Sequence, residues 1–176
     1  MIPAAPGCLY LEKRTTAREL LPELQKGLNA LRKDTGGTVD MSIRFLNHFA
    51  GAGLLFAGET IDDDRVLEIV NFDPVMNKLV AVGTARPYPW APLHWLVFRT
   101  CPECTCIVQV YDDPAAARHF HVDREGIEEL EPTLRTLRER RFVMVEGLGT
   151  LAVGGGIMET MGMANRKMDG SNTTNR

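Results

Sequence analysis

The sequence lacks any apolar run long enough to span a membrane, and its first residues contain no basic segment followed by such a run. We therefore expect neither a membrane protein nor a secreted one, which leaves a cytoplasmic protein as the expectation. Basic residues are not in excess either, because the formal net charge is -3. Without a broad cationic field, the composition gives no support to binding of nucleic acid or of an anionic membrane surface.

Cofactor motifs are scarce as well. Cys101 and Cys104 have the spacing of metal ligands, but a closed structural zinc site needs four ligands and no second such pair follows. Two interpretations stay open for this segment: a loop of small residues after which Cys106 begins a buried strand, or a reversible Cys101–Cys104 disulfide. The glycine-rich segments 51–53 and 154–156 carry neither the lysine of a phosphate loop nor the full dinucleotide pattern.

The pattern that is present indicates one α/β domain. A chain of 176 residues with 44% hydrophobic residues can bury one sizeable core and is short for two domains. We expect a single domain over residues 1–170 and a disordered polar tail over 171–176. Leucines recur at helical spacing after a Thr16–Glu19 capping box, and Pro22 either kinks that helix or begins it.

Apolar runs and turn residues place the remaining elements. The short, turn-rich connection 73–78 predicts that the strands on either side of it pair antiparallel. Helices on both sides of a mostly antiparallel sheet make a three-layer α/β/α domain the expected fold. Strands are predicted at 39–45, 53–58, 66–72, 78–84, 106–111, 142–147 and 150–154, and further helices at 92–99, 113–120, 124–140 and 156–167. The residues expected to be largely buried are Leu24, Leu28, Ile43, Leu55, Ile69, Val80, Val97, Ile107, Val143 and Val145.

The stretch from Arg86 to Asp112 is the most informative, since it reads as a bend, a short apolar helix and a buried strand. Arg86-Pro87 and Pro92-Leu93-His94 fit the outline of the class II aldolase/adducin family, in which a lysine-proline-serine-serine-glutamate bend precedes a proline-leucine-histidine helix. The family strand that follows closes in histidine-x-histidine, and Ile107 to Tyr111 takes its place here. The segment therefore resembles that family.

Three other segments fall in the right order for the same family. Val39-Asp40-Met41-Ser42 resembles its glycine-asparagine-x-serine turn, which holds a substrate phosphate or hydroxyl. Residues 54–58 resemble the next strand and its serine-glycine phosphate turn, with Ala57 in place of serine. Residues 143–149 resemble the late strand that ends in histidine-glycine. The resemblance spans about residues 16 to 160 and implies a class II aldolase-like fold and a homo-oligomer.

The same resemblance implies that the metal chemistry is lost. Gln109, Tyr111 and Leu148 stand at the three histidine positions, and Trp90 stands near the place of the catalytic glutamate. An amide and a phenol are poor zinc ligands and leucine is none. We therefore expect no metal and no other cofactor.

The polar residues that remain near the position of the family's active-site cleft define the expected site. A tyrosine hydroxyl or an imidazole can move a proton, and an arginine can hold a carboxylate or an enolate. The first hypothesis is a metal-independent aldolase-like enzyme, with lyase, isomerase or dehydratase acid/base chemistry on a small anionic or aromatic carbonyl compound. The expected catalytic residues are Tyr111 and His94, and the expected substrate-binding residues are Asp40, Ser42, Gly58, Arg86, Trp90 and Gln109.

Two alternatives from other classes stay open. One is a catalytically inactive, adducin-like binding or regulatory protein. The other is a metal-dependent class II aldolase-type lyase with ligands such as His119, His121 and Cys104. Simpler interpretations also exist for single residues: His94 could bond a neighbouring backbone group, and Trp90 could pack in the core instead of lining a rim for a flat ligand.

Overall fold

The computed structural model of the protein describes residues 6–45, 53–57, 66–87, 90–111, 124–145 and 149–171. The predicted helix 113–120 and the tail residues 172–176 lie outside this part of the chain. The elements are β1 (Gly7–Glu12), the 3-10 helix η1 (Arg18–Leu20), α1 (Leu21–Thr35), β2 (Thr38–Phe45), β3 (Gly53–Ala57), β4 (Val66–Asp73), β5 (Lys78–Val82), α2 (Ala91–Thr100), β6 (Cys106–Tyr111), α3 (Arg124–Arg140), β7 (Phe142–Val145), β8 (Gly149–Gly154) and α4 (Ile157–Ser171).

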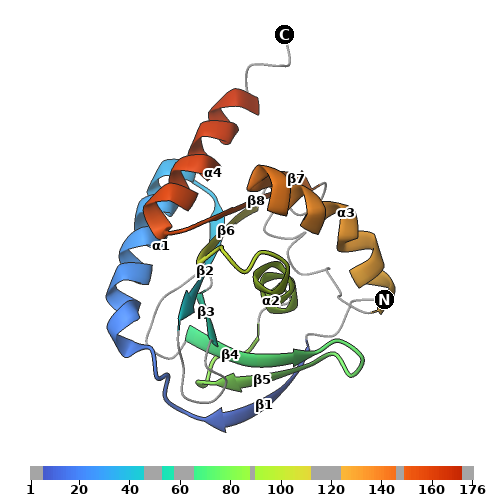
Figure 1. The fold of residues 1–176 in the computed structure, drawn as a ribbon. Helices are drawn as coiled ribbons and strands as arrows, with labels where there is room; N and C mark the ends of the chain where they lie inside the picture. Colours follow the sequence, from blue (N-terminus) through green and yellow to red (C-terminus); the bar gives the residue numbers. More distant parts are fainter. Residues whose placement is uncertain are drawn as a thin grey trace.

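The described strands form one eight-stranded sheet in the order β1-β5-β4-β3-β2-β6-β8-β7. Neighbours pair antiparallel except β1 and β5, which run parallel at one edge. In Figure 1 the strands β4, β5 and β1 cross the direction of β6 and β8 at a steep angle, so the sheet is strongly twisted. The predicted antiparallel pairing across the 73–78 connection is confirmed.

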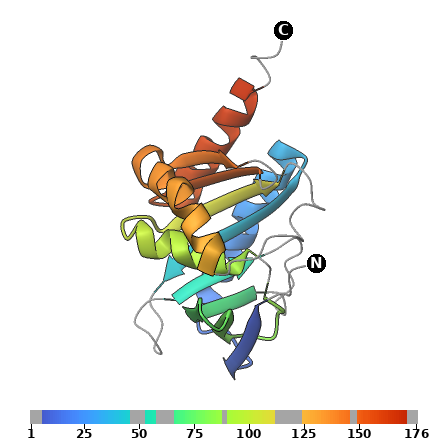
Figure 2. The same ribbon diagram turned by 90° about the vertical axis from the view of Figure 1, so that its right-hand side faces the viewer.

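Helices cover both faces of the sheet. Helices α1 and α4 pack together on one face and α2 and α3 on the other (Figures 1 and 2). Each face has its own apolar core, one built around Leu24, Leu28 and Met41 and the other around Trp90, Leu93 and Ile107. The predicted three-layer α/β/α arrangement with a mostly antiparallel sheet is confirmed.

The first helix shows how the local sequence fixes an element. Leu24, Leu28 and Leu31 recur every three to four residues and form one fully buried stripe. Pro22 lies in the first turn, where its missing N–H removes no helical bond, and the helix ends at Gly36 with a φ of 65°. The expected Thr16–Glu19 capping box is wrong, because the Thr16 hydroxyl instead donates to the buried carboxylate of Glu68 in β4.

Most of the predicted core is buried as expected. Leu24, Leu28, Ile43, Ile69, Val97 and Ile107 are buried, Val80, Val143 and Val145 are half-buried, and the side chain of Leu55 lies outside the described residues. The sequence analysis missed β1, whose large apolar residues Leu9, Tyr10 and Leu11 remain exposed by 40 to 49%. Its edge position explains the miss, since an edge strand without a covering helix need not show the buried pattern of a central strand.

Candidate functional site

The alternation of side chains along β2 and β6 divides their residues between the two cores. Val39, Met41 and Val108 point toward α1 and α4, where they belong to the first core. Asp40 and Ser42 on β2, with Gln109 and Tyr111 on β6, therefore point toward α2. Asp40 and Gln109 are direct partners in the antiparallel register, which brings the four polar side chains together on this face.

Helix α2 lies over these side chains and adds two more. Pro92 in its first turn fixes the start of the helix directly after Trp90. One turn later, His94 reaches the sheet with both ring nitrogens: Nδ1 lies 2.5 Å from Oγ of Ser42, and Nε2 lies 3.0 Å from Oε1 of Gln109. His94 is fully buried and bonds side chains on both strands, not only a neighbouring backbone group.

The environment of His94 defines its protonation. Desolvation by burial lowers the pKa of His94 from 6.5 to about 4, against an opposing effect of the bond with Gln109, so the ring is neutral at pH 7. An amide oxygen can only accept, so Nε2 carries the proton and donates to Gln109. The unprotonated Nδ1 then accepts a hydrogen bond from the hydroxyl of Ser42.

A second hydrogen-bonded pair lies beside the first. The hydroxyl of Tyr111 donates to Oδ2 of Asp40, and both residues are buried. The ring of Trp90 packs against that of Tyr111, with centroids 6.3 Å apart and planes tilted by 46°. We call these six residues the buried polar cluster: Asp40, Ser42, Trp90, His94, Gln109 and Tyr111. None of them is more than 5% exposed.

Gln109 brings to this cluster a buried donor that lacks a partner in the described part of the chain. The amide nitrogen Nε2 of Gln109 is buried and has no hydrogen-bond partner among the described residues. Its orientation is fixed, because Oε1 of the same amide is held by His94. A buried donor without a partner destabilises the folded protein, because the N–H has given up its bond to water. This oriented N–H is therefore suited to bind an oxygen of a ligand.

The residues at the former ligand positions do not fit a zinc ion. The Gln109 oxygen is engaged by His94 and the Tyr111 hydroxyl by Asp40, and neither group belongs to the nitrogen, thiolate and carboxylate set that zinc prefers. Within the described ranges, no group of three or more histidine, cysteine, aspartate or glutamate side chains is placed to hold a metal. Leu148, His119 and His121 lie outside those ranges.

Two other expected site residues are not joined to the cluster. Arg86 is exposed, whereas the buried polar cluster is not, and its charge acts on Tyr10 of β1. Gly58 lies outside the described residues. The structure thus brings six of the eight expected site residues together.

The cysteine segment after α2 is a separate, tightly held loop. Cys101, Cys104 and Cys106 are buried free thiols, and Cys106 is the first residue of β6 as the simpler interpretation predicted. Arg141 donates to Sγ of Cys104 and forms a 3.0 Å ion pair with Glu103. Burial raises the pKa of the Cys101 thiol to about 11, which disfavours its reactive thiolate form.

A further polar anchor was missed by the sequence analysis. The carboxylate of Glu68, fully buried in β4, accepts hydrogen bonds from the hydroxyls of Thr15 and Thr16 and from the backbone N–H of Thr16. The signal was available, because a single glutamate interrupts the apolar strand sequence Val66 to Val70. A charged residue at an interior strand position usually has a partner.

Comparisons with known proteins give the class of the fold. No protein-family model matches the chain, and no curated protein matches its sequence. Solved structures do match: YgbL from Escherichia coli, a candidate aldolase/epimerase/decarboxylase, has a TM-score of 0.65 and 11% identity over 89% of this chain and 88% of its own. A sugar-phosphate aldolase from Thermotoga maritima has a TM-score of 0.60 and 15% identity over 92% and 98% of the two chains. L-fuculose 1-phosphate aldolase has a TM-score of 0.59 and 11% identity over 92% and 90%.

These likenesses run through nearly the whole of each chain and define the architecture. The protein has the class II aldolase/adducin-like fold. At 11 to 15% identity the likeness establishes the fold and not the reaction. Among the helices of the described ranges, none combines the length and the apolar character that crossing a bilayer requires.

Proposed function

We propose that this protein is an aldolase-like enzyme that acts on a small anionic or aromatic carbonyl compound by acid/base chemistry, without a metal ion at Gln109 and Tyr111. The observation that carries the proposal is the unpaired Gln109 amide N–H beside the Tyr111–Asp40 pair. A donor for a carbonyl oxygen and a group able to move a proton are the two functions that a metal-free lyase requires.

The proposed roles follow from the hydrogen bonds. The Gln109 amide donates to the carbonyl oxygen of the substrate. The Tyr111 oxygen takes a proton from the substrate hydroxyl while its own proton passes to Asp40. The carbon–carbon bond then breaks, its electrons move to the carbonyl oxygen as an enolate held by Gln109, and the proton returns to the enolate carbon. His94 acts as a positioning residue, since its Nε2–H fixes the amide of Gln109.

The substrate class follows from the strength of these groups. A neutral amide stabilises an enolate less than a metal cation does, so the substrate must itself spread the developing charge. Compounds in which a carboxylate or an aromatic ring is conjugated to the carbonyl meet that requirement. Trp90 and Tyr111, whose rings pack together, are the aromatic residues of the cluster that a flat group of this kind would contact.

The test measures turnover of a panel of hydroxy-carbonyl compounds, with and without a conjugated carboxylate or aromatic ring. The aldehyde product that is released is the quantity measured. Tyr111→Phe should lower kcat by about 10²- to 10⁴-fold, the usual contribution of a general acid or base. Tyr10→Phe is the matched control, because Tyr10 lies on β1 and its hydroxyl bonds the backbone oxygen of Ala85. EDTA should leave turnover unchanged. Parental activity in Tyr111→Phe, or loss of activity with EDTA, would refute the proposal.

A second function is favoured by a specific observation. Ser42, His94 and Gln109 are completely buried, so a substrate can reach them only if the residues that cover them move. The same burial is expected of a catalytically inactive, adducin-like binding protein in which the cluster only fixes α2 to the sheet. Absence of binding and turnover across the panel, together with loss of association with a protein partner on changing an exposed residue, would favour this function.

The remaining expectations are part of the same proposal. We propose a single domain over residues 1–170 that acts in the cytoplasm, and a homo-oligomer as the resemblance of the sequence to the class II aldolase/adducin family implies. Light scattering after size-exclusion chromatography decides the oligomeric state. A monomer at micromolar concentration would contradict this part of the proposal without touching the chemistry.

A further inference from the structure

A cavity on the opposite face of the sheet has the chemistry of an anion site. It is a partly open surface hollow of about 470 Å³ and lies where the segment after β1 meets the start of α1. Three cationic side chains line it, those of Lys13, Arg14 and Arg18, together with Thr15, Leu21, Pro22, Gln25, Val66 and Gly83. The lining contains no carboxylate. The buried polar cluster lies on the α2 face, so the two sites are separated by the sheet.

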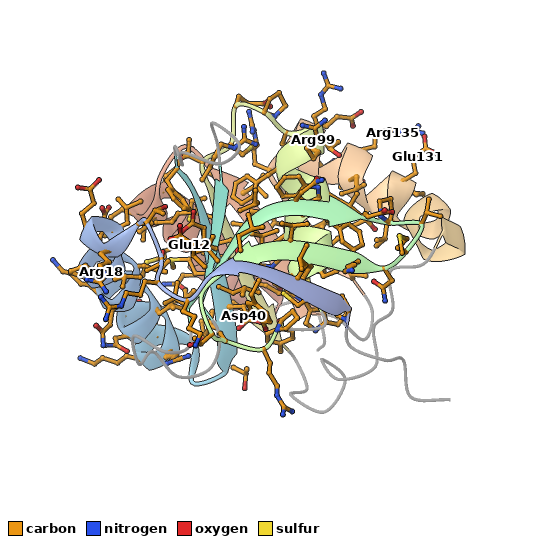
Figure 3. The ribbon with its side chains drawn as sticks, turned by 90° about the horizontal axis from the view of Figure 1, so that it is seen from below. Glu12, Arg18, Asp40, Arg99, Glu131 and Arg135 are labelled. Carbon is orange, nitrogen blue, oxygen red and sulfur yellow. The ribbon has the colours of Figure 1, made fainter. Side chains whose placement is uncertain are left out.

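The three cations have no charge partner in the part of the chain that the structure describes. The ion pairs found there join Arg135 to Glu131 and Arg141 to Glu103. Like charges around one hollow repel one another, and an anion bound there would offset that repulsion. Figure 3 shows Arg18 at the α1 end of the molecule, far from the Arg135–Glu131 pair.

The segment that carries the cations is held in place. Thr15 and Thr16 donate to the buried carboxylate of Glu68, and the backbone N–H of Ala17 donates to the Thr15 hydroxyl at 3.1 Å. Three donors of this segment already engage the carboxylate of Glu68. The backbone around the cavity is therefore fixed before a ligand binds, which lowers the entropy cost of binding.

Gly83 completes the wall by a close approach. A side chain at this position would place its Cβ 2.7 Å from the backbone oxygen of Val66, and the φ of 121° is a conformation that L-residues rarely adopt. The wall at this point is thus bare backbone. Leu21, Pro22 and Val66 supply an apolar side opposite the charges.

We propose that this cavity binds a phosphorylated small organic molecule, with its phosphate on Arg14, Arg18 and Lys13 and its carbon body against Leu21 and Pro22. Arginine binds phosphate through two parallel N–H···O bonds, and the three acceptor oxygens of a phosphate group can engage several cations at once, which suits it to this lining. The volume is in the range of small-molecule sites, and the apolar side distinguishes an ester from free phosphate.

The experiment uses glycerol 3-phosphate, inorganic phosphate and glycerol as probes, with binding followed by titration calorimetry of the full chain. Glycerol 3-phosphate should bind saturably and glycerol should not. The double variant Arg14→Gln/Arg18→Gln should lower the association constant at least tenfold. Arg99→Gln is the matched control, because Arg99 is exposed on α2 and lies away from Arg18 (Figure 3). It should change the constant less than twofold.

The carbon body is tested separately from the charge. Leu21→Ala should weaken binding of glycerol 3-phosphate several-fold and leave inorganic phosphate unchanged. The amide resonance of Gly83 should shift on titration of the parent, which locates the ligand at this wall. The proposal is overturned if the parent binds neither phosphate probe, or if Arg99→Gln weakens binding as much as the double variant. It is also overturned if the ester and free phosphate bind with equal affinity and Leu21→Ala changes neither affinity.

Discussion

Nδ1 of His94 lies 2.5 Å from Oγ of Ser42, and this contact joins helix α2 to strand β2 inside the buried polar cluster. The ring is neutral and accepts the serine hydroxyl, while its other nitrogen donates to Gln109. Protonation of Nδ1 would remove the acceptor and place a positive charge in a fully buried position. The packing of α2 on the sheet therefore depends on a neutral His94.

The first prediction follows for stability against pH. The pKa of His94 is 6.5 in the unfolded chain and about 4 in the folded one, so between these values the unfolded state binds more protons. The contribution of His94 to the free energy of unfolding should thus be constant above pH 6.5 and should fall as the pH drops from 6.5 to 4. With about 1.4 kcal/mol for each pKa unit, the contribution is at most roughly 3.5 kcal/mol. Urea unfolding at a series of pH values measures it.

His94→Gln isolates that contribution from those of other groups. Glutamine can still bond Ser42 and Gln109 but does not titrate in this range. The variant should lose stability less steeply than the parent between pH 6.5 and 4. Identical pH profiles for the two proteins would show that His94 titrates alike in both states.

The second prediction concerns Tyr111→Phe. The change removes the hydroxyl that donates to the buried carboxylate of Asp40 and keeps the ring that packs on Trp90. Loss of a donor to a buried charged group should lower the free energy of unfolding by about 1–3 kcal/mol. Thermal and urea unfolding measure the loss. The control Tyr10→Phe removes a hydroxyl that donates to an uncharged backbone oxygen on a residue 40% exposed, and it should cost less than about 1 kcal/mol; an equal cost in both variants would contradict the special role of the buried pair.

The third prediction is the order of thiol reactivity. Cys101, Cys104 and Cys106 are fully buried with raised pKa values, and burial raises the Cys106 pKa to about 12, whereas Cys8 is only half-buried. A thiol reagent should modify Cys8 first in the native protein and the other three only after unfolding. In Cys8→Ser the fast phase should vanish. Loss of two thiols from the native protein on incubation with oxidised glutathione would instead support the reversible Cys101–Cys104 disulfide.

The fourth prediction uses two glycines. Gly83→Ala places a Cβ against the Val66 carbonyl at a φ of 121° and should lower the free energy of unfolding by roughly 2 kcal/mol or more. Gly156→Ala meets nothing within 4 Å and has no positive φ, so it should change stability by less than about 0.5 kcal/mol. Chemical denaturation of both variants compares them. Equal stabilities would mean that the backbone at Gly83 relaxes without cost.

The sequence predicted the elements whose signals are local. Leu24, Leu28 and Leu31 have a spacing that only a helix places on one face, and the apolar run Cys106 to Val110 fits a strand covered on both sides. The Thr16 capping box failed because a buried carboxylate from Glu68, 52 residues away, competes for the same hydroxyl. A local pattern cannot register such a partner.

The features of the candidate site also fall into those that the local sequence predicts and those that depend on distant contacts. The sequence by itself determined that Gln109 and Tyr111 share one face of a strand, since side chains alternate, and that His94 lies one turn into a helix opened by Pro92. Only the tertiary structure decided that His94 bonds both Ser42 and Gln109, and that the basic residues between β1 and α1 line one hollow with Val66 and Gly83. The physical reason is that strand register and helix docking are set by contacts between residues far apart in the chain, which no local spacing encodes.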